Sequence, residues 1–303
     1  MTDLSVNIAG IKMKNPVMVA SGTFSCDYAD FIDLDKIGAV ISKSVTLKPR
    51  KGNPPPRICE TPSGMLNTIG IENPGIDAFI KKDLMCFSSF SSPLIVSIAG
   101  ETLEEYIELA SRLDGESRVN AIEINVSCPN VEKGCISFGV DPLATIELVR
   151  AVKKETKKPV IVKLTPNVGD IKLVAQAAED GGADAISAIN TVLGMSIDIK
   201  TRKPKLSMGV GGLSGPAIRP IAVRMVREIS KAVKVPVIGI GGIMNADDAI
   251  EFILAGASAI QVGTGNFVNP RAAIEISKGI EKYLASNKFS SIKDIIGLAP
   301  DTR

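Results

Sequence analysis

The chain has 303 residues, of which 45% are hydrophobic, enough for one large barrel or two modest domains. Thirty-five basic and 33 acidic residues leave a formal charge of +2, so neither nucleic acid nor a membrane is an expected partner. No apolar run approaches the roughly 18 residues of a membrane-spanning helix, and no basic signal segment begins the chain. Five cysteines without paired spacing favour a cytoplasmic location, and the lack of histidine disfavours a metal site.

Short apolar runs recur along the chain, each ending in a polar residue or a glycine. Runs of this kind are typical of parallel strands that are covered on both faces. In chain order the predicted strands are Val17–Ala20, Ala39–Ser42, Leu94–Ile98, Ala121–Asn125, Val160–Leu164, Ala185–Asn190, Val237–Gly241 and Ala259–Gly263. The amphipathic helical patterns that alternate with them include Leu103–Leu113, Pro142–Glu155, Ile171–Asp180, Ala217–Ala232, Ala246–Ala255 and Pro270–Ala285.

Eight strands alternating with helices predict the α/β class and a closed TIM (β/α)₈ barrel, with residues 1–303 as a single domain. A doubly wound open sheet is the structural alternative. Thr46–Phe90 is too long for an ordinary connection, so we expect it to lie over the barrel mouth. Leu193–Gly215 is predicted to form an inserted hairpin, and the first ten residues a small hairpin at the barrel bottom.

Polar residues and glycines cluster where the predicted strands end. In a barrel these ends meet at one mouth, where such enzymes keep their chemistry. Two lysines at the ends of apolar strands favour an anionic or electron-rich ligand, although either could reach solvent over its own stem. The residues at these ends are Ser21, Lys43, Ser44, Ser97, Asn125, Lys163, Asn190, Thr191, Gly241, Gly242, Gly263 and Thr264.

The glycines after the last two strands, Gly241-Gly242 and Gly263, indicate a phosphate site made of bare backbone amides, and Gly215 could add a third. Ordinary tight turns are the alternative for any single pair. The run Gly209–Gly212 breaks the spacing of a dinucleotide-binding fingerprint, so a Rossmann site is poorly supported.

The loop after the fourth strand carries Cys128 in the run Asn125-Val126-Ser127-Cys128-Pro129-Asn130. A thiol between two amides at a strand end suits proton transfer or attack on a substrate. A small buried residue in a tight turn is the alternative.

These residues together make the chain similar to a known family. It resembles the dihydroorotate dehydrogenases of the soluble class, most closely the catalytic subunit of the NAD-linked two-subunit type. The resemblance implies an FMN-containing barrel that oxidises dihydroorotate to orotate in pyrimidine biosynthesis. It runs from about Leu4 to the C-terminus and is carried by Asn15–Thr23, Ser42–Thr46, Asn67–Ile71, Asn125–Asn130, Val162–Asn167 and Gly211–Gly215.

The resemblance also implies roles for individual residues. Cys128 matches the catalytic base that takes a proton from carbon five of dihydroorotate, while the hydride from carbon six goes to the flavin. The matching substrate-binding positions are Lys43, Asn67, Thr68, Ile69, Gly70, Ile71, Asn125, Asn190 and Thr191. The matching FMN-binding positions are Ser21, Lys43, Ser44, Ser97, Asn125, Lys163, Ile189, Gly215, Gly241, Gly242, Gly263 and Thr264, with Ser97 standing where the family usually has asparagine.

The NAD-linked type implies a partner subunit that carries FAD and an iron–sulfur cluster, and a homodimer within a heterotetramer. The cysteines of this chain lack the close grouping that a cluster needs. A fumarate-using dihydroorotate dehydrogenase and an FMN-dependent dihydropyrimidine dehydrogenase are the nearest alternatives. A flavin-free barrel, such as an isomerase or a phosphate-ligand binding protein, is an alternative from a different class.

Overall fold

Eight parallel strands close into a barrel that follows the chain order β3-β4-β7-β8-β9-β10-β15-β16, with β16 pairing back onto β3. The computed structural model describes residues 2–25, 28–29, 31–126 and 138–301. This closure confirms the predicted (β/α)₈ barrel and excludes the open sheet. The strands are β3 (Val17–Val19), β4 (Ala39–Ile41), β7 (Leu94–Ile98), β8 (Val119–Asn125), β9 (Val160–Leu164), β10 (Ala185–Ala188), β15 (Val237–Ile240) and β16 (Ala259–Val262).

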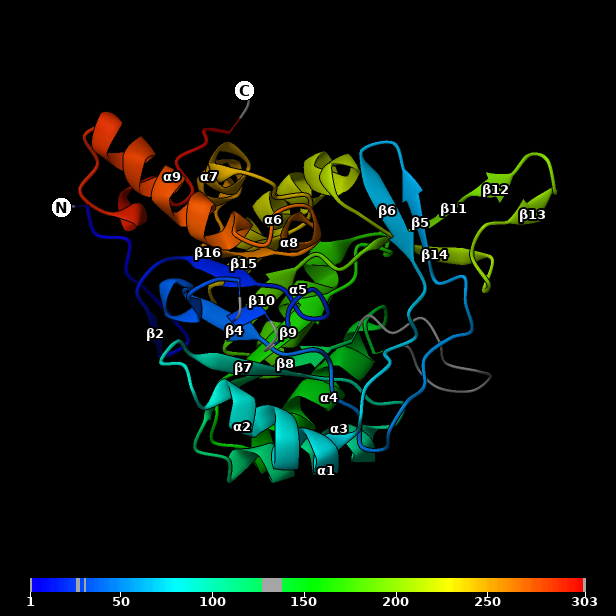
Figure 1. The fold of residues 1–303 in the computed structure, drawn as a ribbon. Coiled ribbons are helices and arrows are strands. Elements are labelled where there is room, and N and C mark those ends of the chain that lie inside the picture. The colour runs from blue at the N-terminus through cyan, green and yellow to red at the C-terminus, as the bar shows by residue number, and fades with distance from the viewer. Residues whose placement is uncertain (1, 26–27, 30, 127–137, 302–303) are drawn as a thin grey trace.

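The main helices form a ring outside the barrel (Figure 1). Four of them are capped at the N-terminus by a side chain that accepts a hydrogen bond from a backbone N–H of the first turn. These bonds satisfy N–H groups that have no partner within the helix. The capping residues are Thr102, Asp141, Asp170 and Asn245. The helices are α3 (Leu103–Asp114), α4 (Pro142–Glu155), α5 (Ile171–Asp180), α6 (Arg219–Ala232), α7 (Ala246–Ala255), the short α8 (Gly265–Val268) and α9 (Ala272–Ser286). Among the described residues no helix is long and apolar enough to cross a membrane.

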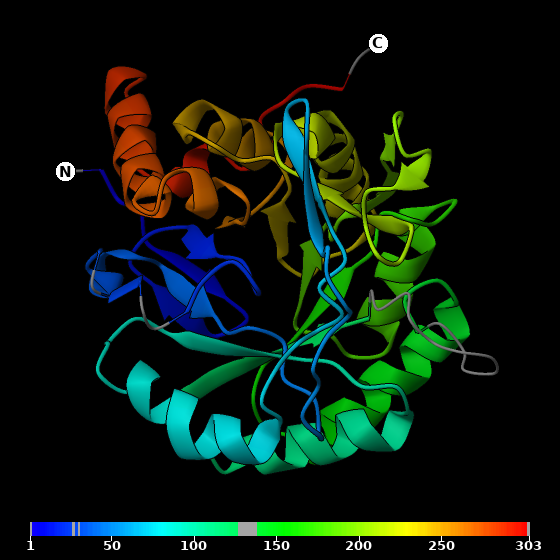
Figure 2. The same cartoon turned by 45° about the vertical axis from the view of Figure 1, so that its right-hand side comes forward.

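The two long insertions join in one antiparallel sheet of order β11-β14-β6-β5. The first insertion supplies β5 (Ile58–Thr61) and β6 (Gly64–Asn67), then α1 (Ile76–Ala78), a π-helical turn (Phe79–Asp83) and α2 (Leu84–Phe87). The second supplies β11 (Val192–Met195) and β14 (Val210–Ser214), with a smaller pair, β12 (Ile197–Asp198) and β13 (Lys203–Pro204), between them. The expected hairpin is therefore two nested pairs, and its contact with the first insertion was not predicted. Figures 1 and 2 show this sheet projecting from the barrel.

The N-terminal hairpin is present as β1 (Val6–Ile8) paired with β2 (Ile11–Met13). Its alternate residues Val6, Ile8, Ile11 and Met13 are buried and join the hydrophobic core. The chain end returns to the same region through the 3-10 helix Ile292–Ile295, since Asp3 pairs with Ser291. A further 3-10 turn, Leu34–Lys36, precedes β4, and Pro216–Ile218 precedes α6.

The barrel interior contains a buried polar cluster that the sequence did not single out. Glu123 of β8 is fully buried, and its Oε2 accepts hydrogen bonds from Ser187 Oγ at 3.0 Å and Gln261 Nε2 at 2.8 Å. Glu123 lies two residues before Asn125, on the same face of its strand, and therefore one step deeper in the barrel. The sequence did contain one sign of this cluster, a single glutamate within the otherwise apolar run Ala121–Asn125.

Candidate active site

Lys163 and Asn125 lie side by side at the barrel mouth, because the register of β8 and β9 pairs them directly. Lys163 is only 5% exposed, and its Nζ donates a hydrogen bond to Ser21 Oγ at 3.2 Å. Ser21 follows β3 on the opposite side of the barrel, so the lysine side chain reaches across the mouth. This arrangement places a cation in the barrel mouth, which suits an electron-rich ligand.

Asn125 is the centre of a chain of side-chain hydrogen bonds across three further strand ends. Its Nδ2 donates to Ser44 Oγ at 3.4 Å, and its Oδ1 accepts from Asn190 Nδ2 at 3.4 Å. Ser44 and Ser97 share a hydrogen bond of 2.9 Å between their buried hydroxyls. The short side chain of Ser97, the departure noted in the sequence, is therefore used to fix Ser44.

Tyr106 of α3 supports Asn125 from behind the barrel wall. Its hydroxyl donates to the backbone oxygen of Asn125 at 2.9 Å, and the side chain is 1% exposed. Its ring contacts Phe138 edge-on, with centroids 5.9 Å apart. Sequence analysis missed this residue, because only the packing of α3 on β8 brings it to the strand end.

Asn190 and Thr191 lie on the loop after β10, where hydrogen bonds to neighbouring residues hold them in place. Asn190 Oδ1 accepts from the N–H of Thr191 at 2.8 Å, which leaves Nδ2 to reach Asn125. Asn167, which follows β9, donates through Nδ2 to Thr191 O at 3.1 Å. Ile189 is buried and donates its N–H to Ile240 O at 3.0 Å.

The loops that carry Gly215, Gly242 and Thr264 converge at the mouth and form what we call the cradle. At Gly242 the cradle has room for backbone only. Gly242 has φ of 73°, and a Cβ there would lie 2.8 Å from both Gly215 O and Arg219 Cβ. Gly215 has φ of 95°, and a Cβ on it would lie 3.7 Å from Thr264 Cγ2, while Thr264 Oγ1 donates to Ser214 Oγ at 2.8 Å. Bare amides from three loops beside the start of α6 suit a phosphate.

The remaining glycines of the predicted set belong to the same strand ends. Gly241 has φ of 130°, and a Cβ there would lie 2.8 Å from Ala222 Cβ of α6 and 3.6 Å from Ile189 Cγ1. A Cβ on Gly263, which directly follows β16, would lie 3.7 Å from Ala20 Cβ. Both positions therefore border the loops that carry Ile189 and Ser21.

The 67–71 segment, which starts at the end of β6, reaches the mouth through the insertion sheet. Asn67 Nδ2 donates to Gly212 O at 3.4 Å, and Gly212 also packs closely against the side chain of Thr191. The segment then bends through two positive φ angles, 77° at Gly70 and 53° at Ile71. Within the described part of the chain, the N–H groups of these two residues have no hydrogen-bond partner.

Two predicted site residues stand apart from these contacts. Lys43 follows β4 and is exposed, and its ammonium makes no ion pair or hydrogen bond with the residues that the structure describes. Cys128 lies outside the described residues, so its predicted role stays a prediction. No cluster of metal-ligating side chains occurs within the described residues.

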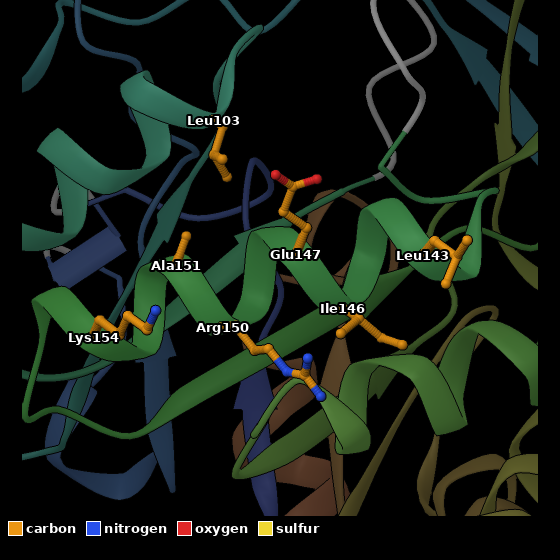
Figure 3. Close-up of a pocket in the computed structure, with 7 residues that line it drawn as sticks. All are labelled: Leu103, Leu143, Ile146, Glu147, Arg150, Ala151 and Lys154. Carbon is orange, nitrogen blue, oxygen red and sulfur yellow. The ribbon is translucent and has the colours of Figure 1, made fainter.

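A surface groove of about 470 Å³ lies beside α4 in the helix ring (Figure 3). It is lined by Leu103 at the start of α3 and by one face of α4, including Leu143, Glu147 and Arg150. None of the predicted site residues lines it, and we assign the candidate site to the barrel mouth.

Comparisons with known proteins agree on one family. The family model described as Dihydroorotate dehydrogenase matches residues 3–284. The catalytic subunit of dihydroorotate dehydrogenase B (NAD(+)) from Citrifermentans bemidjiense is 58% identical over 297 residues, covering 97% of each chain. Catalytic subunits of the same name from Geobacter sp. (strain M21) and Thermoanaerobacter sp. (strain X514) are 57% and 54% identical, covering 97% of this chain and 97% and 98% of their own.

Proposed function

The chain belongs to the dihydroorotate dehydrogenase family, and we propose that it oxidises (S)-dihydroorotate to orotate in pyrimidine biosynthesis as the catalytic subunit of an NAD-linked enzyme. The observation that carries this proposal is the cluster of Lys163, Asn125 and Asn190 at the barrel mouth. Amide side chains offer both donors and acceptors, which suits the imide and amide edges of a pyrimidine ring.

The family uses a flavin, and we propose FMN as its form, because the glycine loops at the mouth suit a single phosphate. Gly215, Gly242 and Thr264 would hold its single phosphate, with Gly241 and Gly263 on the neighbouring strand ends. Ser21, Ser44, Ser97, Asn125, Lys163 and Ile189 would surround the ring, and Lys43 would reach it from β4. When bound, FMN supplies the acceptor for the hydride from carbon six of dihydroorotate.

In the proposed reaction Cys128 removes the proton from carbon five. The pKa of a free thiol, about 8.5, is close enough to neutrality for such a base. Asn125, Asn190 and Thr191 would orient the pyrimidine ring. The N–H groups of Gly70 and Ile71, with the Lys43 ammonium, are suited to the substrate carboxylate, since charge-assisted hydrogen bonds are the strong ones.

The relatives are named catalytic subunits, which implies a separate electron-transfer subunit. We infer that this partner carries FAD and an iron–sulfur cluster and that two copies of the chain form a homodimer within a heterotetramer. The insertion sheet offers a contact surface, an exposed apolar patch: Ile58, Leu193, Met195 and Val210 share one face by register, the face that also carries Asn67, and they are 48–59% exposed. An apolar sheet face of this kind is typical of a subunit contact.

An acceptor screen tests the proposed function against its nearest alternatives. The purified chain is loaded with FMN and given dihydroorotate with a redox dye, NAD or fumarate, and orotate is measured. We expect orotate with the dye and negligible NADH until the partner subunit is added. Turnover with fumarate would instead identify the fumarate-using class. Oxidation of dihydrouracil in place of dihydroorotate would identify a dihydropyrimidine dehydrogenase.

A further inference from the structure

The 67–71 segment has a backbone conformation that its own sequence does not favour. Ile71 has φ of 53°, a left-handed value that a β-branched residue rarely adopts, and it follows Gly70 with φ of 77°. Conformations of this kind persist only where surrounding contacts determine them, and they concentrate at functional sites. The contacts that hold this segment therefore identify residues that support the site.

Asn53 holds the first half of the segment. Its Nδ2 donates to both Thr68 O and Thr68 Oγ1 at 3.0 Å, and its backbone N–H donates to Ile69 O at 3.0 Å. Gly70 packs directly on Asn53, because a Cβ added to this glycine would lie 2.8 Å from Asn53 N and Cγ. One asparagine thus contacts three consecutive residues of the segment.

Asn73 holds the other end and connects it to the barrel. Its Nδ2 donates to Ile71 O at 2.8 Å, and its Oδ1 accepts from the N–H groups of Thr46 and Gly75 at 3.1 and 2.9 Å. The side chain is buried, at 7% exposure. Thr46 follows β4 closely, so this contact ties the segment to a barrel strand.

The two asparagines also lie on neighbouring segments of the chain that are joined by backbone hydrogen bonds. Arg50 and Asn73 exchange backbone hydrogen bonds of 2.9 and 3.0 Å, and the N–H of Thr68 donates to Arg57 O at 2.8 Å. Arg57 Nη1 pairs with Glu72 Oε2 at 2.6 Å. Residues 50–57 therefore lie along residues 68–73 and carry Asn53 to its place.

We propose that Asn53 is a positioning residue for substrate recognition: it fixes the 67–71 segment so that the N–H groups of Gly70 and Ile71 face the ligand carboxylate. The inference rests on the proposed function of that segment. Asn53 has no place in the phosphate cradle or the Lys163 contacts, so its effect should fall on the substrate and leave FMN unaffected.

Asn53→Ala in the FMN-loaded chain tests the role through orotate affinity, measured by calorimetry. We expect an approximately tenfold weaker Kd and a matching rise in KM for dihydroorotate, as the net loss of hydrogen bonds predicts. The kcat and the FMN affinity should stay close to wild type. Asn53→Asp keeps the size but replaces the Nδ2 donor by an oxygen, so it should bind orotate no better than Asn53→Ala. Restored affinity in Asn53→Asp would overturn the hydrogen-bonding role.

Two further variants separate the possible failures. Asn287→Ala is the matched control, because Asn287 also donates through Nδ2 to a backbone oxygen, Tyr283 O at 2.8 Å, but at the end of α9. It should leave orotate affinity unchanged.

Asn67→Ala should weaken orotate binding whether or not Asn53 positions the segment, and its failure to do so would count against the proposed function. Weaker binding in Asn67→Ala with wild-type binding in Asn53→Ala would overturn only the positioning role. A parallel loss of FMN affinity in Asn53→Ala would also overturn it.

Discussion

Lys163 is the residue on which the electrostatics of the site depend. A cation that is 5% exposed is costly unless its surroundings compensate it, and the Ser21 hydroxyl is one group that does so. An electron-rich ring at the mouth would add compensation, and it would gain most when it carries more negative charge. The lysine is therefore expected to favour the reduced form of a bound flavin.

Lys163→Ala should lower the midpoint potential of the bound flavin. A loss of about 1.4 kcal/mol of differential stabilisation corresponds to about 30 mV for a two-electron couple, and we expect a shift of at least this size. Potentiometry on flavin-replete protein measures it. Lys200→Ala, on the exposed turn between β12 and β13, is the control and should leave the potential unchanged. The same potential in wild type and Lys163→Ala would contradict the role.

Single residues of the site differ in how far the sequence could predict them. Asn125 and Lys163 were predictable, because each ends an apolar strand and parallel strand ends meet at one mouth. Tyr106 and Asn53 were not, since their contacts depend on how a helix and a loop pack on distant segments. The role of Cys128 stays a prediction, as it lies outside the described residues.

Among the elements, the loops that carry Gly242 and Gly215 leave little room for a side chain. In the proposed phosphate cradle Gly242 has φ of 73°, and a Cβ added to it would lie 2.8 Å from Gly215 O. A side chain at Gly242 would push its loop away from the loop that carries Gly215. The strands beneath would be unaffected, because their register does not involve this glycine.

Gly242→Ala should weaken FMN binding by the apoprotein, by about tenfold or more, since one strained residue and a displaced loop both act on the phosphate. Fluorescence titration of FMN measures the dissociation constant. Gly115→Ala is the matched control, because Gly115 has φ of −72° and a Cβ there would meet nothing within 4 Å. Equal FMN affinity in the two variants would rule out the cradle.

The helix ring contains a carboxylate that links stability to pH. Asp114, at the end of α3, accepts hydrogen bonds from Thr156 Oγ1 and the N–H of Lys157, both at 2.7 Å. These two bonds hold the pKa of Asp114 below its ordinary value of 3.8. They connect α3 to the chain that follows α4.

Asp114→Asn should lower the melting temperature at neutral pH, because the charged acceptor is lost. A lowered folded-state pKa means that the stabilisation is present above pH about 3.8 and disappears as pH falls through the folded-state value. The difference in melting temperature between wild type and variant should therefore shrink on acidification. A difference that is constant from neutral pH to below the folded-state pKa would refute the linkage.

The local sequence pattern predicted the bounds of individual strands and helices, but it did not predict which distant strands would pair. The strands Leu94–Ile98 and Val160–Leu164 and the helix Pro142–Glu155 have the bounds that their apolar and amphipathic patterns predict. The sheet β11-β14-β6-β5 could not be predicted, because it joins segments about 150 residues apart whose pairing leaves no periodic signal.

At the scale of the whole molecule, the barrel supplies the wall of the site, and the insertions supply the proposed substrate contacts and an exposed apolar face. The same sheet carries Asn67 beside Gly212, and by register the exposed Met195 and Val210 lie on the same face as these two residues. The proposed substrate contact and the proposed subunit contact therefore lie on one element.

The double variant Met195→Glu with Val210→Glu should weaken assembly, because the two residues are directly paired and like charges would be buried together in a contact. Sedimentation of the chain co-purified with its partner subunit measures the fraction of complex, and FMN content should not change. Leu173→Glu, at an exposed apolar position on α5, is the control. Wild-type assembly of the double variant would exclude this face as a subunit contact.

The central claim is that this chain oxidises dihydroorotate with a flavin at the barrel mouth. Anaerobic mixing of the FMN-loaded chain with dihydroorotate tests it most directly. We predict bleaching of the flavin absorbance with one orotate formed per flavin, slowed about a hundred- to ten-thousand-fold in Cys128→Ala, which loses the proposed base. A flavin that stays oxidised in the wild-type chain at saturating dihydroorotate would contradict the claim.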